Sequence, residues 1–185
     1  MTRRSIRVFG DPVLRTRATE VDDFGASLGR LVTDLTDTLE EANGSGLAAP
    51  QIGVGLRVFV YRIVDRESPD YGTYGHLVNP TMHDPSTDVV EELEGCLSVP
   101  GVYYPLARAL RVVARGFDVH GEPVEVVGDD WLARTLLHET DHLDGVLFLD
   151  RLEPEVRRRA MREIREMILS GEPVTVKRSP HAPLG

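Results

Sequence analysis

The chain of 185 residues has a single cysteine, Cys96, and no long hydrophobic run. One cysteine cannot form a disulfide within the chain, so a disulfide-stapled framework is excluded. No apolar stretch approaches the roughly 20 residues that a membrane-spanning helix needs. The first five residues carry two arginines but no apolar segment follows them, which is unlike a secretory signal. We therefore expect a cytoplasmic protein that spans no membrane.

The chain also lacks an excess of positive charge. It has 21 lysines and arginines against 30 aspartates and glutamates, a formal net charge of −9, which argues against DNA as a partner. A hydrophobic content of 41% and a charged content of 28% are typical of a globular domain. The length favours one domain over residues 1–170. Prolines and polar residues predict a frayed tail over residues 171–185.

The pattern of apolar residues predicts both strands and helices. Apolar positions recur at helical spacing over residues 25–42, and Asn43-Gly44 ends that helix. Two more helices are expected over residues 131–142, capped by Gly128-Asp129-Asp130, and over residues 154–169. The expected strands are Arg57–Ile63, Leu77–Met82, Val89–Leu93, Ala109–Val119 and Val124–Val127. This order predicts an α+β fold, with mixed or antiparallel sheets packed around a central motif helix and a C-terminal helix.

The most informative motif is His138-Glu139-Thr140-Asp141-His142. On a helix its two histidines lie four residues apart on one face. Both can therefore bind one divalent metal, while Glu139 reaches a water at that metal. Two ligands do not complete a tetrahedral site, so a third must come from another part of the chain.

Three parts of the chain could supply the third ligand. In the metzincin pattern the third histidine would fall on Phe148, which cannot bind a metal. A glutamate beyond the motif is not excluded by spacing; the candidates are Glu153, Glu155, Glu163 and Glu166. Cys96 is the third source. A lone cysteine is often only a small buried side chain, but one cysteine and two histidines with a water form an open catalytic set.

Three short motifs, in this order, resemble those of the bacterial peptide deformylases. They are Gly44-Ser45-Gly46-Leu47-Ala48-Ala49-Pro50-Gln51, Glu94-Gly95-Cys96-Leu97-Ser98 and His138-Glu139-Thr140-Asp141-His142. The resemblance extends over roughly residues 6 to 168. It implies an enzyme that removes the formyl group from the N-terminal formyl-methionine of newly made polypeptides and releases formate.

The resemblance also implies a role for several residues. The metal ligands would be Cys96, His138 and His142, which hold one divalent ion per chain. In the family this ion is usually Fe²⁺, and Zn²⁺ or Ni²⁺ can take its place. Glu139 would transfer the proton. The side-chain amide of Gln51 and the backbone N–H of Leu97 would donate hydrogen bonds to the formyl oxygen.

Small residues are expected to lie beside the substrate. By resemblance, the peptide lies along Gly44, Ser45 and Gly46 and adds main-chain hydrogen bonds. Gly95 would allow close backbone approach on the other side. Glu94 is expected to orient the Cys96 loop or a nearby polar group. Asp141 is expected to hold a ligand imidazole or a nearby basic group.

The chain departs from the family pattern at two places. Leu137 stands where many members have glutamine, which should affect packing and not metal binding. The arginine that many members carry after the cysteine motif is absent from Val99-Pro100-Gly101-Val102-Tyr103-Tyr104. A contact with the substrate backbone is therefore missing or replaced by a tyrosine.

The C-terminal helix suggests a further partner. In some bacterial members of the family this helix docks on the ribosome. Residues 151–169 contain six arginines and four glutamates, a local charge of +2 in a chain of net charge −9. An ion-paired, solvated helix would have the same composition.

Two other function classes remain, a metallopeptidase and a binding module that has lost catalysis, and both rank below the deformylase.

Overall fold

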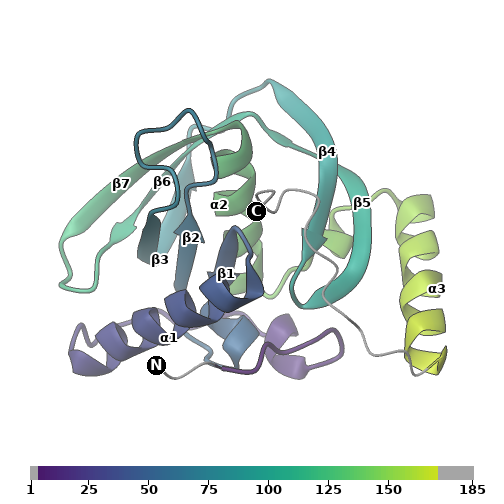
Figure 1. The fold of residues 1–185 in the computed structure, drawn as a ribbon, viewed down its shortest axis with the longest axis horizontal. Coiled ribbons are helices and arrows are strands. Elements are labelled where there is room, and N and C mark those ends of the chain that lie inside the picture. Colours follow the sequence, from purple (N-terminus) through teal and green to yellow (C-terminus); the bar gives the residue numbers. More distant parts are fainter. Residues whose placement is uncertain (1–3, 171–185) are drawn as a thin grey trace.

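The computed structural model describes residues 4–170, so the tail predicted for residues 171–185 lies outside the described residues. Within this range the chain forms three α-helices and seven strands (Figure 1). The helices are α1 (Ala26–Ala42), α2 (Asp130–Leu143) and α3 (Pro154–Ser170). The strands are β1 (Gly46–Ala48), β2 (Val58–Arg62), β3 (Tyr74–His83), β4 (Val89–Cys96), β5 (Val99–Ala109), β6 (Arg111–Phe117) and β7 (Pro123–Asp129). Short 3₁₀ helices are Pro12–Arg15, Ala49–Ile52 (η2) and Phe148–Asp150 (η3).

The strands form two sheets. The larger has the order β1-β2-β3-β6-β7, and the smaller is the β4–β5 hairpin that stands apart from it in Figure 1. Every pair of neighbouring strands is antiparallel. This confirms the predicted α+β fold with antiparallel sheets. β1 pairs only with β2, so it lies at an edge of the larger sheet.

The alternation of side chains along β2 explains how helices cover both faces of the larger sheet. Successive side chains of a strand point to opposite faces. Val58 and Val60 pack in the cluster that contains the leucines of α1. Phe59 and Tyr61 pack in the cluster that contains Leu136 and other apolar residues of α2. Because these two pairs of side chains point to opposite faces of the strand, α1 and α2 lie on opposite faces of the sheet.

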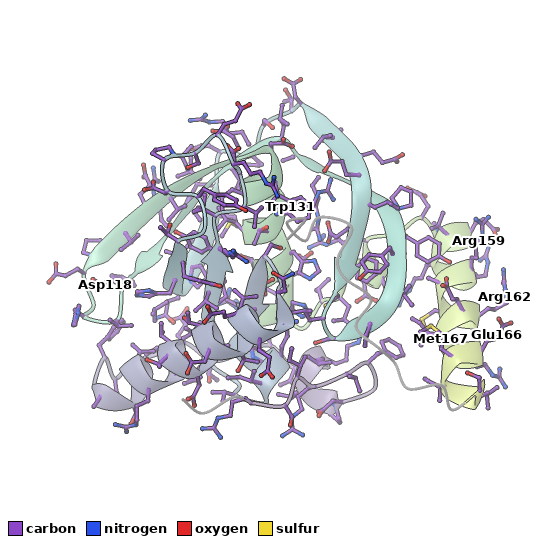
Figure 2. The ribbon with its side chains drawn as sticks, in the orientation of Figure 1. Asp118, Trp131, Arg159, Arg162, Glu166 and Met167 are labelled. Carbon is purple, nitrogen blue, oxygen red and sulfur yellow. The ribbon has the colours of Figure 1, made fainter. Side chains whose placement is uncertain are left out.

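α2 connects the two sheets. It contacts all five strands of the larger sheet and also β5 of the hairpin. α3 packs on the hairpin through Ala160 and Ile164, which belong to a third cluster of buried residues. Its opposite face is exposed, and Arg159 and Arg162 project from it at the outer edge of the molecule (Figure 2). No helix of the described residues is long and apolar enough to cross a membrane.

The sequence did not predict β5, which covers most of the stretch between the cysteine motif and Ala109. Pro100 and Pro105 are unusual within a strand, because proline cannot donate to a sheet ladder. The structure shows why they are tolerated: β5 pairs with β4 alone, so its other edge needs no N–H donors.

The predicted ends of two helices are confirmed in position. Asn43 ends α1 in the left-handed conformation, with φ of 51°, as predicted. Asp129 stands at the N-cap of α2, so the predicted position of the cap is confirmed, but its side chain makes no capping hydrogen bond. The carboxylate of Asp129 instead accepts a hydrogen bond from Arg111 at 3.0 Å.

Candidate metal centre and active site

Three side chains of α2 point inward at the level where α2 meets the hairpin. His138, Glu139 and His142 are 9%, 3% and 1% exposed. The two imidazole rings lie on one face of the helix, and their centroids are 5.0 Å apart. This geometry follows from the spacing of four residues in a helix with 3.6 residues per turn.

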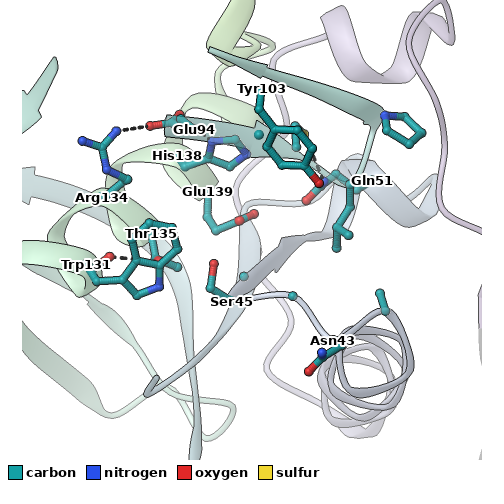
Figure 3. A pocket seen from close by; sticks show the side chains of 17 residues that line it. Asn43, Ser45, Gln51, Glu94, Tyr103, Trp131, Arg134, Thr135, His138 and Glu139 are labelled. Carbon is teal, nitrogen blue, oxygen red and sulfur yellow. Dashed lines mark hydrogen bonds and ion pairs between the residues drawn. The ribbon is translucent and has the colours of Figure 1, made fainter. Parts of the chain in front are cut away.

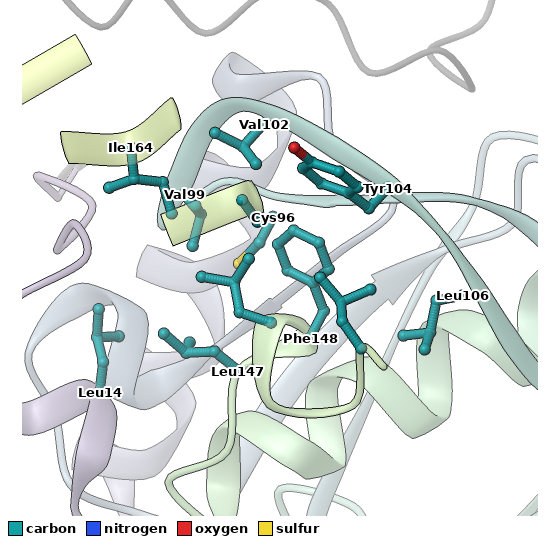
Figure 4. Packing of buried hydrophobic residues seen from close by; sticks show 12 residues of the cluster. Leu14, Cys96, Val99, Val102, Tyr104, Leu106, Leu147, Phe148 and Ile164 are labelled. Atoms are coloured by element: carbon teal, nitrogen blue, oxygen red, sulfur yellow. The ribbon is translucent and has the colours of Figure 1, made fainter. Parts of the chain in front are cut away.

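Cys96 brings a sulfur atom to the two imidazoles. It is the last residue of β4, and its side chain lies in the buried cluster with Val99, Leu147 and Phe148 (Figure 4). Its Sγ is 3.1 Å from Nε2 of His142. One potential ligand atom from each of Cys96, His138 and His142 lies within 4.8 Å of the others.

Among the described residues, no other three histidine, cysteine or acidic side chains form such a group. The downstream glutamates lie elsewhere. Glu153, Glu155 and Glu166 are exposed, and Glu163 accepts a hydrogen bond from the hydroxyl of Tyr104 at 2.8 Å. The structure therefore favours Cys96 over these glutamates as the third ligand.

Glu94 fixes the orientation of His138. Oε1 of Glu94 is 2.8 Å from Nδ1 of His138, and both side chains are buried. Because the ionised carboxylate can only accept, Nδ1 carries the hydrogen of this bond, and Nε2 is the nitrogen that remains for a metal. Histidine ligands in metal sites are commonly held by a carboxylate in this way. The sequence did not show which polar group Glu94 contacts, and the structure shows that it is His138, a candidate metal ligand.

Two buried arginines complete the hydrogen bonding of Glu94. Arg108 of β5 donates from Nη2 to Oε1 at 2.7 Å and from Nε to Oε2 at 3.0 Å. Arg134 of α2 donates from Nη1 to Oε2 at 2.8 Å. Burial favours the neutral acid, but the hydrogen bonds and charges of His138 and Arg108 outweigh it and hold the pKa of Glu94 well below its usual range.

Arg108 also links the hairpin to the motif helix. Its Nη1 donates to Oδ2 of Asp141 at 2.8 Å. Oδ1 of Asp141 accepts a second hydrogen bond, from Nη2 of Arg151 at 2.6 Å. Asp141 therefore holds basic groups and not a ligand imidazole. Removing one partner of a buried pair is strongly destabilising, about 3–5 kcal/mol, since the other charge stays buried. Sequence reasoning missed Arg108 and Arg134, because neither belongs to a motif.

Glu139 lies at the floor of the adjoining groove (Figure 3). Its Oε2 is buried and has no hydrogen-bond partner among the described residues. A Cβ atom on Gly46 would come within 2.5 Å of Oε1, so glycine at this position makes room for the carboxylate. Burial raises the pKa of Glu139 from 4.5 to about 7. The unpartnered Oε2 marks a place where a polar reactant fits.

The side-chain amide of Gln51 faces the cysteine. Its Oε1 accepts a hydrogen bond from the backbone N–H of Ala48 at 2.7 Å. Since that N–H needs an acceptor, the amide nitrogen must point the other way. Nε2 donates to Oγ of Ser98 at 3.2 Å and lies 3.8 Å from Sγ of Cys96. Leu97 lies between Cys96 and Ser98 in the groove wall.

The groove runs between β1 and the hairpin. Its empty space, open solvent at the mouth included, is about 670 Å³. Gly44, Ser45 and Gly46 line one side, and Gly95 and Tyr103 line the other (Figure 3). A Cβ on Gly95 would come within 2.3 Å of the Tyr103 ring, so this glycine is also required for packing. Trp131 and Thr135, which the sequence did not single out, complete the lining.

Comparisons with known proteins identify the family. Residues 3–158 match the family model described as polypeptide deformylase. A peptide deformylase of Acidothermus cellulolyticus is 56% identical over 185 residues, which cover 100% of this chain and 98% of that protein. A crystal structure of peptide deformylase from Ehrlichia chaffeensis matches with a TM-score of 0.83 at 32% identity, covering 91% of this chain and 98% of that one. The chain belongs to the polypeptide deformylase family.

Two further relatives support the same family. A peptide deformylase of Parafrankia sp. is 50% identical over 186 residues, covering 100% of this chain and 98% of the relative. A structure from Legionella pneumophila has a TM-score of 0.81 and 39% identity, covering 93% of this chain and 100% of that one. The deformylase is thus a hydrolase that removes the N-formyl group of newly made polypeptides.

The two departures from the family pattern have different consequences in this deformylase. Leu137 is half-buried and packs with the cluster between α2 and the larger sheet, away from the ligand atoms. The sequence predicted that the arginine contact is either missing or replaced by a tyrosine, and Tyr103 lines the groove. The first departure therefore concerns packing alone, and the second concerns the contact surface for the peptide.

Proposed function

We propose that this deformylase works with one divalent metal held by Cys96, His138 and His142. The close ligand atoms, their burial and the bond from Nδ1 of His138 to Glu94, which leaves Nε2 for a metal, support this proposal. One sulfur and two imidazole nitrogens suit Fe²⁺, Zn²⁺ and Ni²⁺, and the family resemblance favours Fe²⁺. When bound, such an ion polarises the formyl oxygen and lowers the pKa of a coordinated water toward about 7.

Glu139 is proposed as the group that moves the proton. Water adds to the formyl carbon, the carbon–nitrogen bond breaks, and the products are formate and a free amino terminus. The carboxylate takes a proton from the attacking water and passes it to the leaving nitrogen. The buried Oε2 without a partner and the raised pKa, near neutrality, support this role.

Gln51 and Leu97 are proposed to stabilise the negative charge that develops on the formyl oxygen. The amide nitrogen of Gln51 faces the ligand atoms, since its oxygen is held by Ala48. The backbone of Leu97 follows directly on Cys96 in the wall of the groove. Donors that are fixed before the reaction need no reorganisation when the charge appears.

The peptide is proposed to bind along the edge strand β1. Gly44 and Ser45 come directly before β1, and Gly46 is its first residue. In the described residues, β1 has a neighbouring strand on one side only. An edge strand offers unpaired backbone groups to an extended peptide. Gly95 and Tyr103 form the opposite wall, where the tyrosine hydroxyl takes the place of an arginine side chain.

The proposal is tested by anaerobic purification, elemental analysis and measurement of formate released from a formyl-Met peptide. We expect close to one divalent ion per chain, loss of activity on chelation, and recovery with Fe²⁺. The same peptide without the formyl group should remain intact. Cleavage of that peptide would instead identify a metallopeptidase, and a metal-free preparation with full activity would refute the metal centre.

The location and extent of the enzyme are also proposed. The thiol of Cys96 must remain reduced to bind a metal, and the substrate is made on ribosomes, so we place the enzyme in the cytoplasm. Because α2 contacts both sheets and α3 packs on the hairpin, residues 1–170 are proposed to form one catalytic domain.

Ribosome docking through α3 is a separate proposal. Arg157 and Arg158 form ion pairs with nearby acids. In contrast, the exposed arginines Arg159, Arg162 and Arg165 form no ion pair with the described residues. They remain available to ribosomal RNA, whose attraction weakens as salt rises.

Replacing Arg159, Arg162 and Arg165 with glutamine should lower ribosome affinity by about tenfold or more at low salt. Truncating α3 is a poor test, because Ala160 and Ile164 belong to the core. The control removes the exposed charges of Arg111 and Arg115 on β6. Co-sedimentation at low and high salt measures the effect. Equal loss of affinity in both variants would assign binding to net charge and not to α3.

A further inference from the structure

Ser98 places a buried hydroxyl against the amide of Gln51. Its exposed fraction is 0%. The backbone of Ser98 is fixed twice, since its carbonyl accepts from Phe9 N–H at 2.7 Å and its N–H donates to Sγ of Cys96 at 3.3 Å. Its Oγ then lies 3.2 Å from Nε2 of Gln51. The hydroxyl is therefore held on a rigid support and aimed at the amide.

The Gln51 amide has three hydrogen bonds, with the N–H of Ala48, Oγ of Ser98 and Sγ of Cys96, and the first two constrain it differently. The bond from Ala48 to Oε1 decides which end of the amide is oxygen and which is nitrogen. That single contact still allows the amide plane to turn about it. The bond from Nε2 to Ser98 removes this freedom, because it fixes one of the two N–H groups. The other N–H is then directed toward the side of Cys96 and the ligand group.

We propose that Ser98 is a positioning residue that locks the Gln51 amide so that its second N–H, which faces Sγ of Cys96, can donate to the developing formyl oxyanion. This inference rests on the proposed role of Gln51 as an oxyanion donor. A donor that is fixed in advance stabilises the transition state more than one that must first be ordered. Ser98 touches no reacting atom, so its effect should fall on kcat and pass entirely through Gln51.

Ser98→Ala removes only the hydroxyl and leaves the backbone N–H bond to Cys96. On metal-loaded enzyme, we expect kcat per bound metal to fall about 3- to 30-fold with KM and metal content unchanged. Ser98→Thr keeps Oγ and should retain kcat within about threefold. The control Thr38→Val deletes a buried hydroxyl of α1, 3% exposed, and should keep wild-type kcat.

A double-mutant cycle with Gln51→Ala separates the two claims. Gln51→Ala alone should lower kcat by about 10²–10³, and Ser98→Ala should then have no further effect. Wild-type kcat in Gln51→Ala would refute the oxyanion role itself. If Gln51→Ala is impaired but Ser98→Ala is not, or if the two losses multiply, the positioning role alone is overturned. A loss in Ser98→Thr equal to that in Ser98→Ala would assign the effect to packing.

Discussion

Replacing Glu139 with glutamine is expected to lower kcat by about 10²–10⁴ while the metal stays bound. Glutamine has nearly the same shape as glutamate, but it cannot accept and release a proton. The ligand atoms of Cys96, His138 and His142 are untouched by the change. Only the proton transfer between the attacking water and the leaving nitrogen is removed, so the loss should appear in kcat and not in metal content.

The measurement is formate release at saturating formyl-Met peptide, with the metal content of the same sample determined in parallel. The matched control is Glu166→Gln, which removes an exposed carboxylate from α3 and should leave kcat unchanged. Turnover of Glu139→Gln at the wild-type rate would show that another group moves the proton. Loss of metal in this variant would show that Glu139 supports the ligands instead.

The sequence predicted the site better than its surroundings, for a physical reason. A helix fixes the spacing of His138 and His142, so two ligands and Glu139 can be read from the chain. The position of Cys96 depends on how the hairpin folds onto α2. Its assignment came from the family resemblance, and the structure brings it within 4.8 Å of the histidines.

The buried ion pairs could not be predicted. Arg108 lies in β5, a strand that the sequence did not predict, and Arg134 lies one turn before His138 on α2. Neither residue has a local sequence signal, because an arginine is usually exposed and its partner is decided by tertiary packing. Glu94 was the only indication, because a carboxylate close to the cysteine is expected to contact a polar or basic group. The identity of that partner, His138 with the two arginines, appears only in three dimensions.

Cys96→Ala is expected to abolish tight metal binding and, with it, activity. Changing a residue that merely orients a metal ligand commonly costs about 10–100-fold in affinity, so deleting a ligand should cost more than about 100-fold. A ligand that binds only the folded state raises the melting temperature. Added metal should therefore stabilise the wild-type chain but not Cys96→Ala. Chelator competition and thermal melts with and without Fe²⁺ or Zn²⁺ measure both effects.

The variant also removes a side chain from a buried cluster, so a packing control is needed. Val99→Ala makes a comparable cavity in the same cluster and should bind metal as wild type while it melts at a lower temperature. The pH dependence gives an independent readout. A thiol must lose its proton to bind a metal, so wild-type affinity should fall as the pH falls, and the residual affinity of Cys96→Ala should fall less. Wild-type affinity in Cys96→Ala would show that a different side chain is the third ligand.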